Sequence, residues 1–343
     1  MVEGNFGGNK SLDSPCLKPY NYCMEDVLKV PPTLVEAVRY FADPDICIRF
    51  VAAVRWPNGP VCPKCQGVEH FYLKTRRLWK CKSCEKQFSV KVGTIFEDSA
   101  VALDKWLIAF WMLVNCKNGI SSYEIKRDVK VTQRTAWFML QRLRLATQSK
   151  SFEKLSGDVE VDESFIGGKA RNMHADVKAR KIQGRRGPMG KAIVAAVLER
   201  GGKVRATVVD RRKKKDLHAL VRENVEPKSA LYSDALKSYD GLSDEYEHQV
   251  IDHAVEYVNG NIHTNGMENF WSLLKRGING TYVNVEPYHL FRYVDEQVYR
   301  FNHRKESDSE RFMGALSQIA GRRLTWEQLM ASFPGGERQC PIT

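Results

Sequence analysis

Apolar residues recur at helical spacing in two parts of the N-terminal half. One pattern covers residues 34–41, and a longer one runs from residue 103 to about 149. Apolar positions three and four residues apart mark one face of an α-helix. A Pro-Asn-Gly-Pro sequence at 57–60 ends the first pattern, because proline and glycine interrupt helices. The first 150 residues are therefore predicted to be mainly helical, with a cysteine-bearing segment at 61–92 between the helical parts.

The pattern changes near residue 156, where runs rich in Val, Ile and Ala replace helical spacing. Such runs are typical of strands, and the Gly201-Gly202 pair between two of them indicates a hairpin. Helical spacing returns in the last third of the chain. Strands are predicted at 158–168, 191–200, 203–212, 229–234 and 249–252, and helices at 216–225, 265–278, 290–302, 312–319 and 326–333.

These patterns predict an α+β multidomain chain, and its 343 residues suffice for two or three domains. No internal repeat is evident. The predicted parts are a loosely ordered arm at 1–30, a helical segment at 31–60, a cysteine-bearing ribbon at 61–92, a helical unit at 101–150, a sheet domain at 156–305 and a helical tail at 306–343.

Lys and Arg outnumber Asp and Glu, which gives a formal net charge of +12. This surplus favours a polyanionic partner without naming it. The longest apolar stretch, 106–114, is too short for a membrane helix, and the N-terminus lacks the apolar core of a signal peptide. The nine cysteines are therefore interpreted as thiols or metal ligands and not as a disulfide framework.

Four cysteines have the spacing of a zinc site. Cys62 and Cys65 form one CxxC pair, Cys81 and Cys84 form another, and fifteen residues separate the pairs. Each pair places two thiolates on a tight turn, and two pairs complete a tetrahedral sulfur shell for Zn²⁺. Since no ligand position is left for water, the predicted zinc is structural. The many Lys and Arg of this ribbon favour a contribution to DNA binding.

Residues 121–144 have the layout of a helix-turn-helix. Two apolar helix faces are separated by Val131-Thr132, which supplies a turn and a helix N-cap. The second helix of such a unit enters the major groove of DNA. Gln133, Arg134 and Arg144 on that helix are the candidate DNA contacts, and two ordinary packed helices are the alternative.

Three carboxylates form a candidate metal site. Asp162 lies in one predicted strand, Asp234 ends another, and Glu268 is near the start of a helix. Two Asp on adjacent strands and a Glu on a later helix form the RNase H-like arrangement, which holds two Mg²⁺ or Mn²⁺ ions for phosphodiester chemistry. Lys275 follows Glu268 by two helical turns and is a candidate phosphate contact. Glu160, Glu163 and Asp240 are rival acids, and His263 is a possible helper.

Two basic runs adjoin these acids, at 169–191 and 211–215. The first contains glycines, but their spacing is not that of a P-loop. Together the runs favour a phosphate-binding surface. The candidate phosphate contacts are Lys169, Arg185, Arg186, Lys275 and Arg276.

These motifs occur in one order: CPKC and CKSC, then SSYEIKRDVKVTQRTAWFMLQRLR, VEVDESFIGGKARN, LYSDALKSYDGL and VNGNIHTNGMENFWSLLKRGINGTY. Over about residues 33–305 the chain closely resembles the IS1595 (ISXO2-like) family of bacterial insertion-sequence transposases. The resemblance implies a zinc ribbon and helix-turn-helix followed by an RNase H-like DDE catalytic domain with C-terminal helices. By position, it assigns Asp162, Asp234 and Glu268 to the acidic triad and Lys275 to the trailing lysine.

The resemblance implies an enzyme that binds the inverted ends of its element, hydrolyses phosphodiesters and transfers strands into target DNA. It also implies a homodimer or larger assembly on DNA, a cytoplasmic location in a bacterium at the nucleoid, and no membrane partner. Two alternatives stay open: an RNase H-like nuclease that only cuts, and a non-catalytic DNA-binding regulator that uses only the ribbon and the helix-turn-helix.

Overall fold

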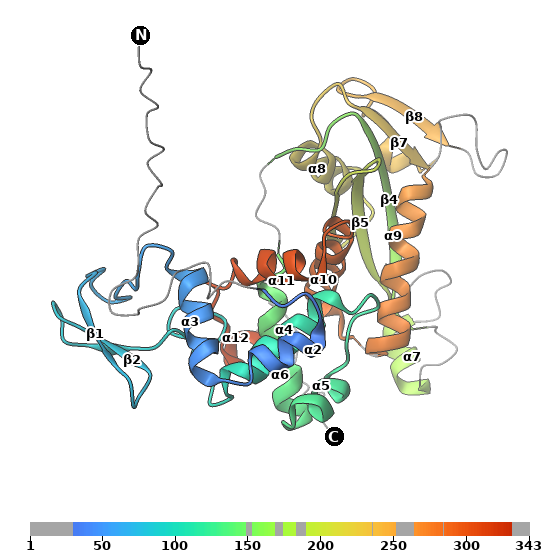
Figure 1. The fold of residues 1–343 in the computed structure, drawn as a ribbon. Coiled ribbons are helices and arrows are strands. Elements are labelled where there is room, and N and C mark those ends of the chain that lie inside the picture. The colour runs from blue at the N-terminus through green and yellow to red at the C-terminus, as the bar shows by residue number, and fades with distance from the viewer. Residues whose placement is uncertain are drawn as a thin grey trace, which may run out of the picture.

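The structure, a computed structural model, describes residues 30–148, 153–168, 174–182, 190–234, 236–251, 264–283 and 285–330. Figure 1 shows three parts that follow one another across the molecule: a small N-terminal ribbon, a central group of helices and a larger sheet with its own helices. In the part of the chain that the structure describes, no helix is long and apolar enough to cross a membrane.

The N-terminal part consists of two helices followed by a three-stranded antiparallel ribbon. Each helix starts at a residue suited to capping: the side chain of Thr33 accepts from the backbone N–H of Glu36, and Asp43 accepts from that of Asp45. The elements are α2 (Leu34–Tyr40), α3 (Pro44–Arg55), β1 (His70–Leu73), β2 (Leu78–Cys81) and β3 (Gln87–Phe88).

The predicted helical unit contains α4 (Leu103–Asn115), α5 (Ser122–Val129) and α6 (Gln133–Leu145). Helix α5 begins with a capping box between Ser121 and Glu124 and ends at Lys130, which has a left-handed backbone conformation. The Thr132 side chain caps α6. The two helices and the turn between them are confirmed.

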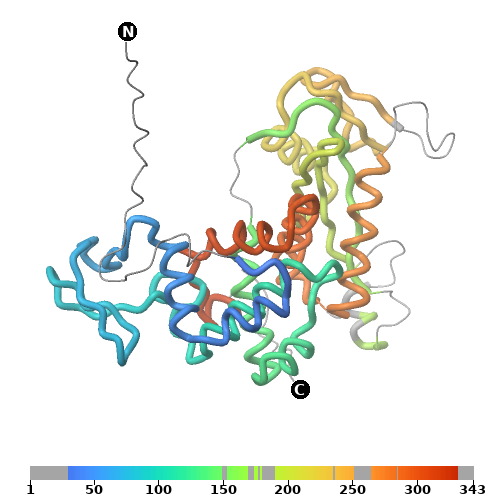
Figure 2. The backbone as a smooth tube through the Cα atoms, in the orientation of Figure 1, coloured from blue at the N-terminus to red at the C-terminus, as the bar shows by residue number. Residues whose placement is uncertain are grey.

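The C-terminal helices return to the N-terminal ones. Figure 2 shows the last helices beside the first along the chain. Phe312 of α11 (Asp308–Leu316) packs against Phe50 with ring centroids 6.3 Å apart and against Trp111 at 5.1 Å. Both rings belong to the buried core that the ribbon and helices α2–α6 share. The stretch that the sequence predicted as a tail therefore contributes to this core, and α12 (Trp326–Met330) follows it.

The second part is a five-stranded mixed sheet with the order β6-β5-β4-β7-β8. Strands β4, β5 and β6 are antiparallel, whereas β7 is parallel to both β4 and β8. The β5–β6 connection closes at Gly201, whose positive φ of 71° suits the tight turn. The strands are β4 (Asp158–Ile166), β5 (Ala192–Glu199), β6 (Val204–Val209), β7 (Ala230–Asp234) and β8 (Glu247–Ile251).

Helices cover both faces of the sheet. One face packs on α8 (Lys214–Asn224), and the other packs on α9 (Asn265–Arg276) and α10 (Leu290–Asn302). Figure 1 shows α9 lying along the sheet. Short turns η2 (Lys237–Tyr239), η3 (Gly277–Tyr282) and η4 (Pro287–His289) complete this part. Helix α7 (Ala175–Ile182) was not predicted, because its basic residues were interpreted only as a charge run.

Candidate active site and metal centre

The four cysteines of the ribbon form a metal-binding cluster. Their sulfur atoms all lie within 4.8 Å of one another, with 3.7 Å between Cys62 and Cys84 and 3.5 Å between Cys65 and Cys81. None of the four is in a disulfide. Zinc–sulfur bonds of about 2.3 Å in a tetrahedron place the sulfurs about 3.8 Å apart. The cluster therefore fits a structural Zn²⁺ ion, as predicted.

Local backbone geometry builds this cluster. The residue after each CxxC pair, Gln66 or Glu85, has a positive φ, of 61° and 55° respectively. This conformation turns the chain back tightly after each pair of thiols. Backbone N–H groups of Cys84 and Ser83 lower the pKa of the Cys81 thiol to about 6, and the thiolate is the form that binds zinc.

Asp162 and Asp234 lie on neighbouring strands. The β4–β7 register pairs Glu160 with Tyr232, so two residues further along both parallel strands Asp162 and Asp234 stand at the same level. Since side chains alternate along a strand, both belong to the face that α9 covers. The Trp271 indole N–H of α9 donates to Asp162 Oδ2 at 2.9 Å, and the backbone N–H of Glu163 donates to Oδ1 at 2.8 Å.

The surroundings of the Asp162 carboxyl disfavour its negative charge. Burial raises its pKa to about 6, and the negative charges of Glu163 and Asp234 add to the increase. The hydrogen bond from Trp271 acts in the opposite direction. A cation between Asp162 and Asp234 would compensate this repulsion, and carboxylate oxygens are the ligands that Mg²⁺ and Mn²⁺ prefer.

Two of the three rival acids have structural partners. Glu160 is fully buried, accepts the Met267 N–H at the start of α9 at 2.7 Å and pairs with Arg200 at 3.1 Å. Glu163 pairs with Arg212 at 3.0 Å and accepts from the Tyr239 hydroxyl at 2.9 Å. These contacts hold α9 and the β6–α8 connection on the sheet. The third rival, Asp240, is exposed after η2.

Glu268 and Lys275 lie on the exposed face of α9. The opposite face, with Met267, Phe270 and Leu274, is buried against the sheet. Glu268 precedes Trp271 by one helical turn, and Trp271 contacts Asp162. Within the described ranges, however, the four cysteines are the only group of three or more His, Cys, Asp or Glu whose ligand atoms lie within 4.8 Å. The three acids therefore lie in one region, but their carboxylate oxygens do not all lie within 4.8 Å of one another.

Sequence reasoning missed Trp271, and it treated Glu160 only as a rival acid. Trp271 holds the Asp162 carboxylate, and Glu160 fixes the first turn of α9. The signal for Trp271 was its place one turn after Glu268, where an aromatic side chain with an N–H donor meets the sheet. The structural role of Glu160 had no signal in the sequence, because Glu160 and Asp162 lie two residues apart and share one face of β4.

The predicted DNA contacts differ in their surroundings. Arg134 is exposed, and its guanidinium stacks 4.5 Å from the centroid of Trp326. Gln133 is half-buried and donates to Ser122 at 2.9 Å. Lys275 and Arg276 are both exposed on α9. Four predicted residues lie outside the described residues: Lys169, Arg185, Arg186 and His263.

The prediction that Arg144 contacts DNA from an exposed face of α6 is wrong. Arg144 is only 1% exposed, and its Nε donates to Glu296 of α10 at 2.7 Å. Its guanidinium also stacks on Tyr293, 3.8 Å from the ring centroid. Helix α10 covers the side of α6 that the sequence pattern predicted to face DNA. Arg144 therefore connects α6 to α10, which packs on the sheet.

Asp162→Asn should stabilise the protein when no Mg²⁺ or Mn²⁺ is added. The folded-state pKa of about 6 exceeds the ordinary 3.8, so the ionised carboxyl disfavours folding at pH 8 by about 3 kcal/mol. Asn keeps one of the two hydrogen bonds, which removes about 1 kcal/mol of this gain. Urea unfolding should show the variant about 2 kcal/mol more stable at pH 8. The difference should shrink by more than half at pH 5, and a less stable variant at pH 8 would contradict the electrostatic argument.

The fold and these sites define a zinc-ribbon protein with a separate mixed α/β domain. The model of the transposase zinc-ribbon domain matches residues 43–87, and that of the ISXO2-like transposase domain matches residues 154–302. The chain belongs to the ISXO2-like (IS1595) transposase family.

Two relatives agree with this family. An uncharacterized protein in the transposable element ISH50 of Halobacterium salinarum is 28% identical over 251 residues, which cover 70% of this chain and 84% of the relative. An uncharacterized transposase-like protein of Haemophilus influenzae is 33% identical over 101 residues, which cover 29% of this chain and 81% of the relative.

Proposed function

We propose that this transposase binds the inverted ends of its insertion sequence, cuts the DNA there and joins the freed ends to target DNA. The observation that carries the proposal is the placement of Asp162 and Asp234 at one level of neighbouring strands, under the helix that bears Glu268 and Lys275. A strand-transfer assay with element-end DNA and Mg²⁺ tests it. Joined products that require the metal are the expected result.

Each acid has a proposed role at this site. Asp162, on the central strand, would hold two divalent cations together with Asp234 and Glu268. When bound, Mg²⁺ or Mn²⁺ ions activate the attacking oxygen and stabilise the leaving oxygen. Trp271 orients the Asp162 carboxylate through its hydrogen bond. Lys275, two turns beyond Glu268, binds a DNA phosphate near the scissile bond.

The start of α6 is proposed to read the element ends. Helix-turn-helix units place the first residues of the second helix against base edges, and Arg134 is exposed there. Gln133→Ala combined with Arg134→Ala should weaken binding to the element end by about tenfold or more, because a good base contact contributes about 1–3 kcal/mol. Mobility shifts should show a much smaller loss on random DNA. Equal losses on both DNAs would mean phosphate contact only.

Two other functions remain to be separated. A nuclease that only cuts would share the acidic site, and a regulator would need only the ribbon and the helix-turn-helix. The strand-transfer assay distinguishes all three, since a nuclease gives cut but unjoined DNA and a regulator gives neither product. The burial of a carboxyl with a raised pKa beside a second Asp favours a catalytic site over a regulator.

The reaction also implies an assembly. Two element ends must be held in one complex, so we propose a dimer or larger multimer on DNA. Light scattering with and without paired element ends measures this state. A strictly monomeric protein that still joins both ends would contradict the proposal.

A further inference from the structure

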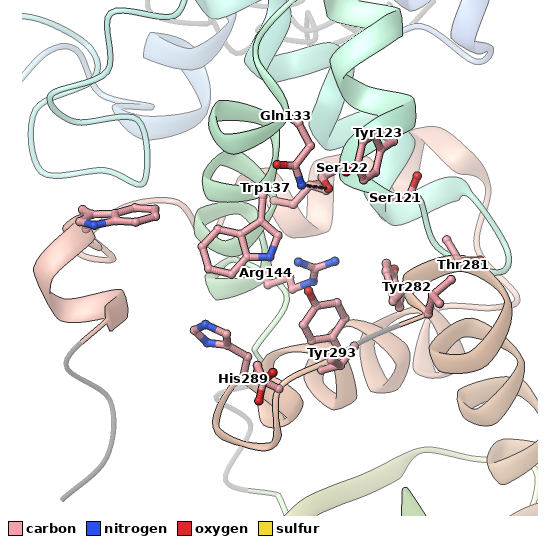
Figure 3. A pocket seen from close by; sticks show the side chains of 15 residues that line it. Ser121, Ser122, Tyr123, Gln133, Trp137, Arg144, Thr281, Tyr282, His289 and Tyr293 are labelled. Atoms are coloured by element: carbon pink, nitrogen blue, oxygen red, sulfur yellow. Dashed lines mark hydrogen bonds between the residues drawn. The ribbon is translucent and has the colours of Figure 1, made fainter. Parts of the chain in front are cut away.

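A cavity of about 410 Å³ lies where the two helices of the helix-turn-helix meet the segment from η3 to α10 (Figure 3). Its volume is in the range of pockets that hold small molecules. The beginnings of both α5 and α6 line it, through Ser121, Ser122 and Gln133. The proposed catalytic acids do not contribute to its wall, so the cavity is distinct from the acidic site.

Aromatic rings form much of the cavity wall. Trp137 and His289 have ring centroids 5.2 Å apart, and Tyr282 and Tyr293 are 4.7 Å apart. Figure 3 shows the first pair on one side and Tyr282 on the other, with Arg144 and Tyr293 between them. Both pairs meet edge-on. Aromatic walls favour a flat aromatic ligand, and nucleic-acid bases bind such surfaces without regard to sequence.

Two buried donors of the wall lack partners among the residues that the structure describes. Arg144 uses its Nε on Glu296, and its Nη1 and Nη2 donate to no acceptor there. His289 Nδ1 lies 3.1 Å from a guanidinium nitrogen of Arg292 and must accept from it, because arginine only donates. The ring proton is therefore on Nε2, which also has no described partner. A ligand that satisfies both groups must supply acceptor oxygens or nitrogens.

The charged side chains that line the cavity are Arg144 and Glu286, and the buried groups behind the wall add a positive surplus. Arg144 and Arg300 share the single carboxylate of Glu296, which leaves a surplus positive charge in the interior, and buried charge without a partner is costly. The N-termini of α5 and α6 add positive partial charge at the cavity. Burial and two neighbouring arginines lower the pKa of His289 to about 4, so its ring is neutral near pH 7 and remains a donor at Nε2.

We propose that this cavity binds one nucleotide of a DNA strand that has turned out of the base stack. The base packs against the ring of Trp137, and the oxygens of the nucleotide accept from Arg144 and His289. A nucleotide matches this wall because it joins a flat ring system to a negatively charged group. The assignment rests on the proposed function of the chain in handling DNA.

The position of the cavity fits such a ligand. Segment η3, which bears Tyr282, continues directly from α9 at Gly277. The helix that carries Glu268 and Lys275 therefore ends at the cavity wall. A nucleotide held there fixes the DNA strand at one end of α9, while Arg134, which is exposed on α6 and outside the cavity wall, contacts the neighbouring duplex.

Two duplexes that differ by one unpaired nucleotide test the proposal. The probes are a fully paired 30-base-pair duplex and the same duplex with one unpaired central thymidine, and free dTMP is the third. An unpaired base has little unstacking left to overcome, so the wild-type chain should bind the second duplex about tenfold more tightly. Trp137→Leu and His289→Ala should abolish this preference, with binding to the paired duplex retained. Phe138→Leu, a neighbour outside the cavity wall, is the matched control and should keep it.

Every other result overturns the assignment in a recognisable way. Equal binding of both duplexes by the wild-type chain removes the nucleotide cavity and leaves the proposed DNA function intact. A preference that survives Trp137→Leu and His289→Ala places the unpaired base elsewhere. Saturable dTMP binding that Trp137→Leu abolishes, without a preference between duplexes, identifies a free nucleotide as the ligand. Binding to neither duplex removes the DNA function and this assignment together. Thermal melting of each variant checks that it is folded.

Discussion

Asp162→Asn, Asp234→Asn and Glu268→Gln are each expected to abolish metal-dependent cleavage and joining of element-end DNA. Each change keeps the shape of the side chain and removes a negative charge that divalent cations need. Metal ions contribute several kcal/mol to stabilising phosphodiester transition states, which corresponds to a loss of about a thousandfold or more in rate. Gel assays of cut and joined products measure this effect, and mobility shifts should show nearly unchanged end binding.

Asp240→Asn is the matched control, because Asp240 is an exposed acid close to Asp234 in sequence. Glu163→Gln is a second control with a different expectation. Glu163 is paired with Arg212 and Tyr239, so its loss should reduce stability more than chemistry. If the three main variants retain strand transfer with Mg²⁺, or if Asp240→Asn is equally inactive, the acidic site is misplaced.

Cys84→Ser is expected to remove zinc and unfold the ribbon. The ribbon has a small apolar core, in which Trp79 stacks on Phe88 with centroids 5.9 Å apart and Trp56 packs edge-on. Structural zinc contributes about 10–16 kcal/mol to such folds, comparable with the whole stability of a domain. Metal analysis should find the zinc lost, and limited proteolysis should cut within residues 61–90.

Cys116→Ser is the control for this experiment, since Cys116 is a half-buried thiol at the end of α4 and outside the cluster. It should keep its zinc and its resistance to protease. A wild-type protein purified without zinc, or a Cys84→Ser variant with full zinc content, would contradict the assignment of the cluster.

The sequence predicted most elements because local chemistry fixes them. The β5–β6 hairpin follows from a glycine pair, α6 follows from the Thr132 cap, and the zinc cluster follows from cysteine spacing alone. The strand positions of Asp162 and Asp234 were also predicted. Their shared level on the sheet was not, since it depends on the register between β4 and β7.

Long-range packing explains what the sequence did not reveal. Arg144 lies off the apolar face of α6, which is typical of an exposed residue, but its partners Tyr293 and Glu296 are about 150 positions away in α10. The spacing of apolar and polar residues along the chain gives no sign of this contact. The position of Phe312 could not be predicted either, because its ring contacts residues of α2–α4 at the other end of the chain.

The position of Phe312 affects what an incomplete gene could produce. The core that α2, α3 and α4 share closes only when α11 inserts Phe312 among Phe41, Phe50 and Trp111. A chain still on the ribosome lacks this helix, so the core is completed only near the end of translation. A gene copy with a stop codon before Asp308 should therefore yield an unstable fragment that proteases remove. If the chain binds the element ends as proposed, such damaged copies would not supply a competitor for them.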